Sequence, residues 1–267
     1  MTPRDTTFSV DVKGPPLAFW AGAVLIIGVS LVMLARGLAV DWTLVDIGAD
    51  YRIVTDAGRR WVETGVYYLP EQMAGPYSWP GPWVLYPPPS LLLFVPFVYL
   101  PALLWWAVPI AVTSWVVAQH RPSPLGWAVI LFCLANPTTI SSIAWGNPAM
   151  WLVAFLALGT RYGWPGVLVF LKPSLFPFAL FGVSNRSWWL ALAVCGAASL
   201  AFLPMWFDYL TVTRNAQAPM GWFGYSTAQI PFMLLPVVAW LSRAGSPAAR
   251  WSWRSARRTA GGPAPLR

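Results

Sequence analysis

Acidic side chains are concentrated in one stretch of this 267-residue chain, residues 41–89. Six of the nine acids lie there: Asp41, Asp46, Asp50, Asp56, Glu63 and Glu71. A carboxylate can take a proton from a substrate hydroxyl as a general base. Asp50 and Asp46 are the first candidates, and their spacing of four residues puts both on one face if the segment is helical. A turn through Gly48 fits as well, and the acids then solvate a loop or cap a helix that begins near Tyr51.

Four cations and one amide could cooperate with these acids. Arg52, Arg59 and Arg60 either form solvated ion pairs, or one of them binds a phosphate, which suits the guanidinium geometry. Lys172, one of two lysines in the chain, interrupts an apolar run. It either marks the end of a short span, with its amine reaching water, or serves a functional site. Asn147, in a WGNP turn, is either a helix cap or a hydrogen-bond donor to substrate.

The composition indicates an integral membrane protein. Hydrophobic residues make up 57% of the chain and charged residues 10%, whereas a soluble domain carries about 25% charged residues. The 19 tryptophans suit aromatic belts at the two membrane interfaces. The net charge of +8 owes much to six arginines after residue 242. A basic tail beside a membrane helix favours a cytoplasmic anchor over a nucleic-acid arm, so no nucleic-acid partner is expected.

Apolar runs predict an all-α, polytopic helical bundle of about eight segments. Residues 1–16 form a cytoplasmic N-terminal segment, 17–242 the membrane domain and 243–267 a basic cytoplasmic tail. The runs are 17–39, 90–119, 125–144 with an interruption at Asn136–Pro137, 149–158, 164–181, 188–206 and 229–241. The second run is either one kinked helix or two short spans joined at Leu100–Pro101. An even number of spans puts both termini in the cytoplasm and residues 41–89, the first long loop, outside.

The external loop divides into a helix and an irregular part. Residues 51–64 have helical spacing, with Ile53, Val54, Ala57, Trp61 and Val62 on one face, and Gly65 is a natural stop. We expect this amphipathic helix to lie in the membrane interface with its apolar face down. Residues 66–89 are rich in Pro, Gly and aromatics, which predicts a folded loop on the membrane. Residues 208–228 form a second polar loop.

The motifs resemble those of a known enzyme family. The order Asp50-Tyr51-x-x-Val54-x-x-Ala57, Gly65-x-Tyr67-Tyr68, Leu85-Tyr86-Pro87-Pro88, Gly146-Asn147 and Lys172-Pro173 runs over about residues 17–185. It resembles the family 87 glycosyltransferases, polyprenol-phosphate-mannose-dependent α-mannosyltransferases of the GT-C class. Family members are usually longer at the C-terminus, and the glutamine of the family's glycine motif is not evident here. The shortened half implies an altered acceptor site, a partner subunit or lost activity.

The resemblance implies a multi-pass cell-membrane enzyme with an external active site. Such an enzyme moves a hexose, mannose or a similar sugar, from a polyprenyl-phosphate donor to a cell-envelope glycolipid or glycan, with inversion. Asp50 matches the family's catalytic aspartate, with Asp46 as its substitute in another register. Tyr86 and Pro87 match the loop that closes over the donor, and Tyr67 in the neighbouring motif is a further substrate-binding candidate. Lys172 and the arginines of the loop are candidates for the lipid phosphate.

No cofactor is expected beyond the lipid-linked sugar, and the sequence offers no obvious ligand set for a divalent metal. Two other classes of protein remain open. A lipid or sugar transporter would use the broken helices and Lys172 as a substrate path, and a non-catalytic membrane scaffold would bind another protein through the aromatic loop.

Overall fold

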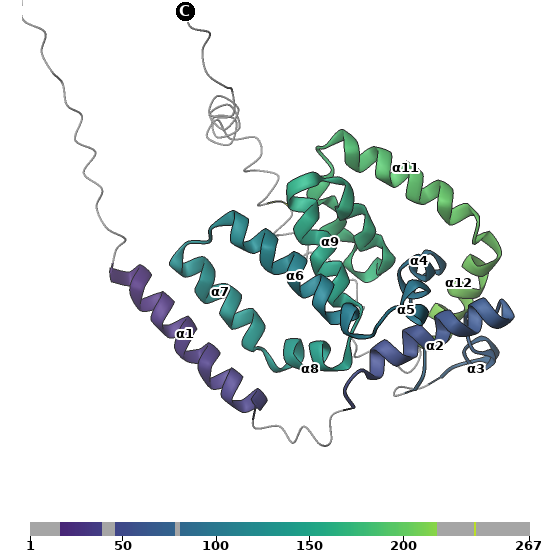
Figure 1. Cartoon of the computed structure of the whole chain (residues 1–267), viewed down its shortest axis with the longest axis horizontal. Helices are drawn as coiled ribbons and strands as arrows, with labels where there is room; N and C mark the ends of the chain where they lie inside the picture. Colours follow the sequence, from purple (N-terminus) through teal and green to yellow (C-terminus); the bar gives the residue numbers. More distant parts are fainter. Residues whose placement is uncertain (1–16, 39–45, 78–80, 218–237, 239–267) are drawn as a thin grey trace, which may run out of the picture. The chain divides into compact units, whose positions relative to one another are not determined.

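The fold is all-α, as predicted. The computed structural model describes residues 17–38, 46–77, 81–217 and 238, and no strand occurs among them (Figure 1). Backbone contacts divide the chain into two compact units, residues 1–45 with 120–142, and residues 46–119 with 143–267. The candidate site belongs entirely to the second, larger unit.

The smaller unit is built on two helices that pack side by side. Helix α1 (Leu17–Leu38) contacts α7 (Pro124–Ala135) (Figure 1). The predicted break at Asn136 is confirmed, since α8 (Pro137–Trp145) is bent by 61° from α7. Pro137 cannot donate a backbone hydrogen bond to the preceding turn. The Asn136 side chain instead accepts a hydrogen bond from the Thr138 N–H at 2.9 Å.

Helix α2 (Ala49–Thr64) confirms the helix predicted for the polar segment. Gly65 ends it in the left-handed conformation, φ 75°, and donates its N–H to the Trp61 carbonyl. Val54 and Ala57 are buried and the helix packs on α4 (Leu91–Phe94) and α5 (Pro96–Tyr99). The apolar face predicted to lie on a membrane is therefore covered in large part by protein, whereas Val62 at its far end is 44% exposed.

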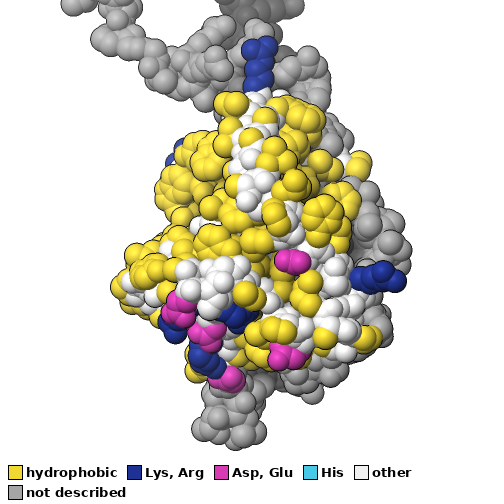
Figure 2. Space-filling model, turned by 90° about the vertical axis from the view of Figure 1, so that its right-hand side faces the viewer, with side chains coloured by type: hydrophobic (Ala, Val, Ile, Leu, Met, Phe, Trp, Pro, Cys, Tyr) yellow, Lys and Arg dark blue, Asp and Glu magenta, His cyan; other side chains and the backbone are white. Residues whose placement is uncertain are grey.

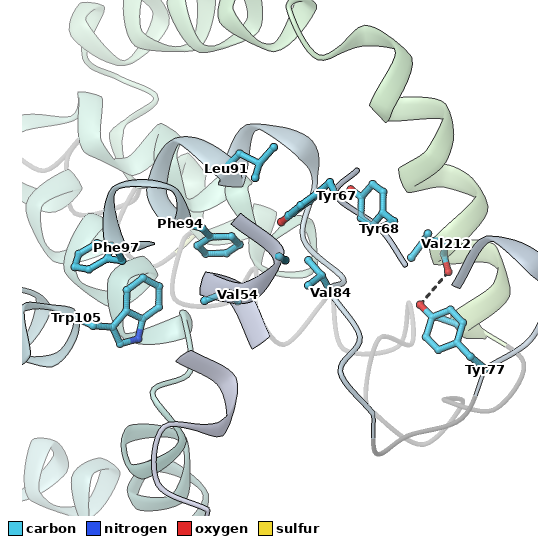
Figure 3. Packing of buried hydrophobic residues seen from close by; sticks show 12 residues of the cluster. Val54, Tyr67, Tyr68, Tyr77, Val84, Leu91, Phe94, Phe97, Trp105 and Val212 are labelled. Atoms are coloured by element: carbon cyan, nitrogen blue, oxygen red, sulfur yellow. Dashed lines mark hydrogen bonds between the residues drawn. The ribbon is translucent and has the colours of Figure 1, made fainter. Parts of the chain in front are cut away.

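The loop that follows α2 forms part of the core. Four residues of this loop are buried: Tyr67, Tyr68, Tyr77 and Val84 (Figure 3). They pack with residues of α2, α4, α5, α6 (Leu103–His120) and α12 (Leu203–Gln217). The Tyr77 hydroxyl donates to the Val212 carbonyl at 3.1 Å, drawn as a dashed line in Figure 3. One turn of helix, α3 (Pro70–Ala74), also lies in this segment. The loop therefore packs on protein through its buried aromatic side chains. The composition alone does not predict this packing.

The predicted run 90–119 is broken near Leu100–Pro101, as in the second of the two alternatives, and is not one kinked helix. A 3-10 turn, η2 (Pro88–Ser90), leads into α4 and α5, and the chain breaks before α6 (Leu103–His120). Pro109 lies inside α6 without ending it. Among the described residues α6 is the single helix long and apolar enough to cross a membrane. The number reaches three when each bent pair, α7 with α8 and α11 with α12, counts as one span.

Two predicted segments are wrong. The run 164–181 is no continuous span but four short pieces: η3 (Trp164–Leu171), η4 (Pro173–Leu175), α10 (Phe176–Ala179) and η5 (Leu180–Gly182). Prolines at 165, 173 and 177 each begin a new turn. A proline cannot donate a backbone hydrogen bond within a helix, so these residues prevent one long helix. The run 188–206 ends early, because α11 (Arg186–Leu200) gives way to α12 (Leu203–Gln217) at a bend of 91°.

Helix α12 includes residues 208–217 of the segment 208–228 that was predicted to be a polar loop, and the rest of that segment lies outside the described residues. Its sequence after Pro204 contains neither Pro nor Gly up to Gln217, so its polar residues do not prevent a helix. Helix α9 (Ala149–Tyr162) extends four residues beyond its predicted end. The segment 1–16, the last predicted span and the basic tail lie outside the described residues, Val238 excepted. The total of about eight spans stays a prediction.

Candidate functional site

The first turn of α2 is fixed to the turn between α8 and α9. Gly48, with φ 79°, donates its N–H to the Ala144 carbonyl at 2.8 Å. Two indole N–H groups of α6 hold the other side of that turn. Trp105 donates to the Gly146 carbonyl and Trp106 to the Ile143 carbonyl, each at 2.7 Å. These bonds join segments that lie far apart in the sequence.

Gly146 allows this turn to approach α2 closely. Its φ is 70°, a conformation that glycine adopts without steric cost. A Cβ atom there would lie 2.7 Å from the Trp106 ring and 2.9 Å from Tyr51 Cβ. The Tyr51 ring contacts both Trp105 and Trp106, with centroids 5.6 and 5.3 Å away. The glycine of the Gly146-Asn147 motif thus brings the following residue beside the start of α2.

Asp50 and Asn147 meet at this contact, 97 positions apart in the chain. The Asn147 amide nitrogen donates to Asp50 Oδ2 at 2.6 Å. The Asn147 Oδ1 accepts the N–H of Ala149, the first residue of α9, at 2.9 Å. Each end of the amide therefore has a hydrogen-bond partner. Asp50 Oδ1 has none among the described residues.

Lys172 and Tyr86 complete the cluster from two further segments. Lys172 follows η3 directly and is half-buried. Its Nζ lies 5.7 Å from the centre of the Tyr86 ring, which is within reach of a cation–π interaction. The Tyr86 ring packs edge-on against Phe94, with centroids 5.3 Å apart, and its carbonyl accepts the Tyr68 hydroxyl at 2.8 Å. The structure thus brings together four predicted site residues: Asp50, Tyr86, Asn147 and Lys172.

The electrostatics of Asp50 suit a proton acceptor. Burial raises the pKa of its carboxyl above the ordinary value, while the hydrogen bond from Asn147 and the positive charge of Lys172 act in the opposite direction. Because the effect of burial is the largest of the three, Asp50 holds a proton more readily than a carboxylate in water does. A raised pKa at a partly buried carboxyl is typical of catalytic bases.

The arginines predicted for the site lie on the outer face of α2, and Asp46 lies just before its first residue. Arg52 is paired with Asp46, and Arg59 with Asp56 at 3.8 Å, all four side chains being exposed. This arrangement agrees with the solvated ion-pair interpretation. Arg60 donates from Nη2 to the Tyr67 carbonyl at 2.5 Å.

A shallow hollow of about 300 Å³ runs along this outer face of α2. Its lining residues are Asp46, Ala49, Arg52, Ile53, Asp56, Arg60 and Pro82. In Figure 2 acidic and basic side chains lie interleaved low on the face shown, whereas hydrophobic side chains dominate above them. Asp46 contacts Arg52 at the surface, whereas Asn147 contacts Asp50. Asp50 is therefore the carboxylate of the cluster.

Two predicted substrate-binding residues belong to the core. Tyr67 is 2% exposed and its hydroxyl lies 2.9 Å from Ser90 Oγ. Pro87 is fully buried. Neither side chain offers a surface to a ligand in this structure, and packing accounts for both residues. Their contact with substrate stays a prediction. Trp105 and Trp106 were missed, although an indole N–H within an apolar run signals a buried hydrogen-bond partner.

No metal centre can be assembled from the part of the chain that the structure describes, since no three His, Cys, Asp or Glu side chains gather there. The cluster offers one carboxylate, one ammonium group, one amide and one aromatic face, which suits proton transfer beside an anion. Comparison of the chain with protein-family models, characterised proteins and solved structures found no match.

Proposed function

We propose that this protein is a membrane hexosyltransferase that uses a polyprenyl-phosphate sugar as donor and a glycolipid or glycan of the cell envelope as acceptor. The observation that carries the proposal is the pairing of Asp50 with Asn147 beside Lys172. Three segments of a chain with few charges converge there. The resemblance of the same residues to family 87 motifs supports the reaction class.

The proposed step is an inverting displacement in which Asp50 is the base. The acceptor hydroxyl gives its proton to Asp50 Oδ1 as its oxygen forms a bond to the anomeric carbon of the donor. The bond from that carbon to the phosphate oxygen breaks, and the lipid phosphate leaves with the electron pair. The ammonium group of Lys172 stabilises the negative charge that develops on the leaving phosphate. Tyr86 offers an aromatic face to the sugar ring.

The surface supports a membrane setting for this chemistry. Helices α11 and α12 expose a series of large apolar side chains: Trp189, Leu190, Val194, Leu200, Leu203, Phe207 and Leu210. A soluble monomer rarely exposes so many together. Contact with lipid or with a partner subunit would cover them, and a polyprenyl chain needs an apolar path to the donor site.

The test is sugar transfer by the purified full-length chain. The protein in detergent receives a radiolabelled polyprenyl-phosphate hexose and a cell-envelope lipid extract, and labelled products are separated. The wild type should form a new labelled product. Asp50→Asn should slow product formation about 10²–10⁴-fold, whereas the matched variant Asp46→Asn, just before α2, should retain it. Product formation by Asp50→Asn at the wild-type rate would show that Asp50 is not the base. No product from the wild type would leave the transporter or scaffold as the better account.

A further inference from the structure

Asn147 is fixed from both ends of its side chain. Its Oδ1 accepts the N–H of Ala149 and its amide nitrogen donates to Asp50. The residue before it, Gly146, is buried, and its carbonyl is bound to Trp105. The amide group therefore has one orientation, in which its donor faces the carboxylate and its acceptor faces the start of α9.

We infer that Asn147 is a positioning residue for the carboxylate of Asp50 and does not bind substrate directly. The hydrogen bond holds Oδ2, which turns Oδ1 towards the space where an acceptor hydroxyl would arrive. This inference rests on the proposed function for its chemistry, and it replaces the predicted contact between Asn147 and substrate. A hydrogen bond to an ionised carboxylate is among the stronger ones in proteins, so its loss should change the behaviour of the base.

Few other groups can set the charge state of Asp50. Lys172, at the end of η3, is the charged side chain that acts on it. The neighbouring helices α4, α5 and α8 carry no charged residue, and α6 carries only His120, at its far end. Arg52, the nearest arginine on α2, is paired with Asp46. Asp46, the other acid beside the start of α2, is neutralised by that pair. Lys172 is therefore the titrating group whose charge acts on Asp50 together with the hydrogen bond from Asn147.

Asn147→Asp is the most informative variant because it replaces the amide nitrogen by oxygen and keeps the shape of the side chain. An aspartate keeps the oxygen that accepts the Ala149 N–H but loses the N–H group that binds Asp50. Two carboxylates in contact cannot both ionise readily, so Asp50 should hold its proton to higher pH. The matched control is Asn136→Asp, since Asn136 caps α8 in the same way and has no acidic partner.

Two readouts test the inference. In the transfer assay, kcat/KM of Asn147→Asp at the acidic end of the profile should fall about tenfold or more, and its acid limb should move to higher pH. Independently of activity, the pH at which a carbodiimide labels Asp50, measured by peptide mass spectrometry, should rise in Asn147→Asp. Neither quantity should change in Asn136→Asp. Asn147→Ser, which keeps a capping oxygen without adding charge, should show a smaller shift in the same direction.

The outcomes separate this inference from the proposed function. If the wild type transfers sugar but the labelling midpoint of Asn147→Asp equals that of the wild type, Asn147 does not position Asp50. If no sugar is transferred but the midpoint still moves, the contact is real and the proposed reaction is wrong. If Asn147→Asp does not fold, the labelling midpoint of Asn147→Ser decides: an unchanged midpoint overturns the inference.

Discussion

Substituting Gly146 by alanine should destabilise the larger unit and impair the site together. The added Cβ would lie 2.7 Å from the Trp106 ring and 2.9 Å from Tyr51 Cβ, closer than non-bonded carbon atoms approach. Overpacking of this kind costs about 1–3 kcal/mol. The left-handed backbone, φ 70°, costs about 1–2 kcal/mol more for a residue with a Cβ. The expected loss of unfolding free energy is therefore about 2–5 kcal/mol.

Two other glycines separate these contributions. Gly65 has φ 75° but open space around its Cβ position, so Gly65→Ala should lose only the backbone part, about 1–2 kcal/mol. Gly196, inside α11, has neither a left-handed φ nor a neighbour within 4 Å. Gly196→Ala should be neutral or stabilising by up to about 1 kcal/mol through helix propensity.

The assay is unfolding of the purified variants in one detergent, by denaturant or by heat, followed by circular dichroism. The expected order of stability is Gly196→Ala, Gly65→Ala, then Gly146→Ala. Sugar transfer by Gly146→Ala should fall further than its folded fraction, because the displaced turn carries Asn147 away from Asp50. The reasoning about close approach would be refuted if Gly146→Ala were no less stable than Gly65→Ala.

Two further predictions concern charge and hydrogen bonding. Burial raises the pKa of Asp50 in the folded state above its pKa in the unfolded chain. Above the folded-state pKa, the ionised carboxylate therefore lowers the free energy of unfolding. Below the unfolded-state pKa it has no such effect. Asp50→Asn should therefore raise the unfolding midpoint at pH 7 but not at pH 3; equal midpoints for the two proteins at pH 7 would count against a desolvated carboxylate. Tyr77→Phe removes the hydroxyl that donates to the Val212 carbonyl and should cost about 1 kcal/mol in the same unfolding assay; no loss would show that this bond contributes nothing.

Local signals in the sequence predict the local elements well. The 3.6-residue pattern of α2 and its stop at Gly65, the break at Asn136 and the turn at Gly146 follow from periodicity, proline and glycine. The same signals do not say what covers an apolar face. Hydropathy does not distinguish contact with lipid from contact with protein. It therefore predicts that the apolar face of α2 and the segment 164–181 meet the membrane. In the structure, the apolar face of α2 contacts α4 and α5, and the segment 164–181 breaks into short turns.

The candidate site shows the same division. Asp50, Asn147 and Lys172 are rare polar residues at motif positions, and the structure brings them together. Tyr67 and Pro87 came from the same motifs, yet they are buried. Sequence spacing cannot distinguish a motif residue that packs from one that faces a ligand, because that difference depends on contacts between segments far apart in the chain.

The most direct test of the account compares donor binding with turnover in Asp50→Asn. Binding of the polyprenyl-phosphate hexose is measured by equilibrium titration, and turnover by release of the lipid phosphate at saturating donor and acceptor. A general base contributes about 10²–10⁴-fold to rate. We predict that Asp50→Asn binds the donor as the wild type does and turns over about 10²–10⁴-fold more slowly. Turnover within a fewfold of the wild type would contradict the assignment of Asp50 as the base.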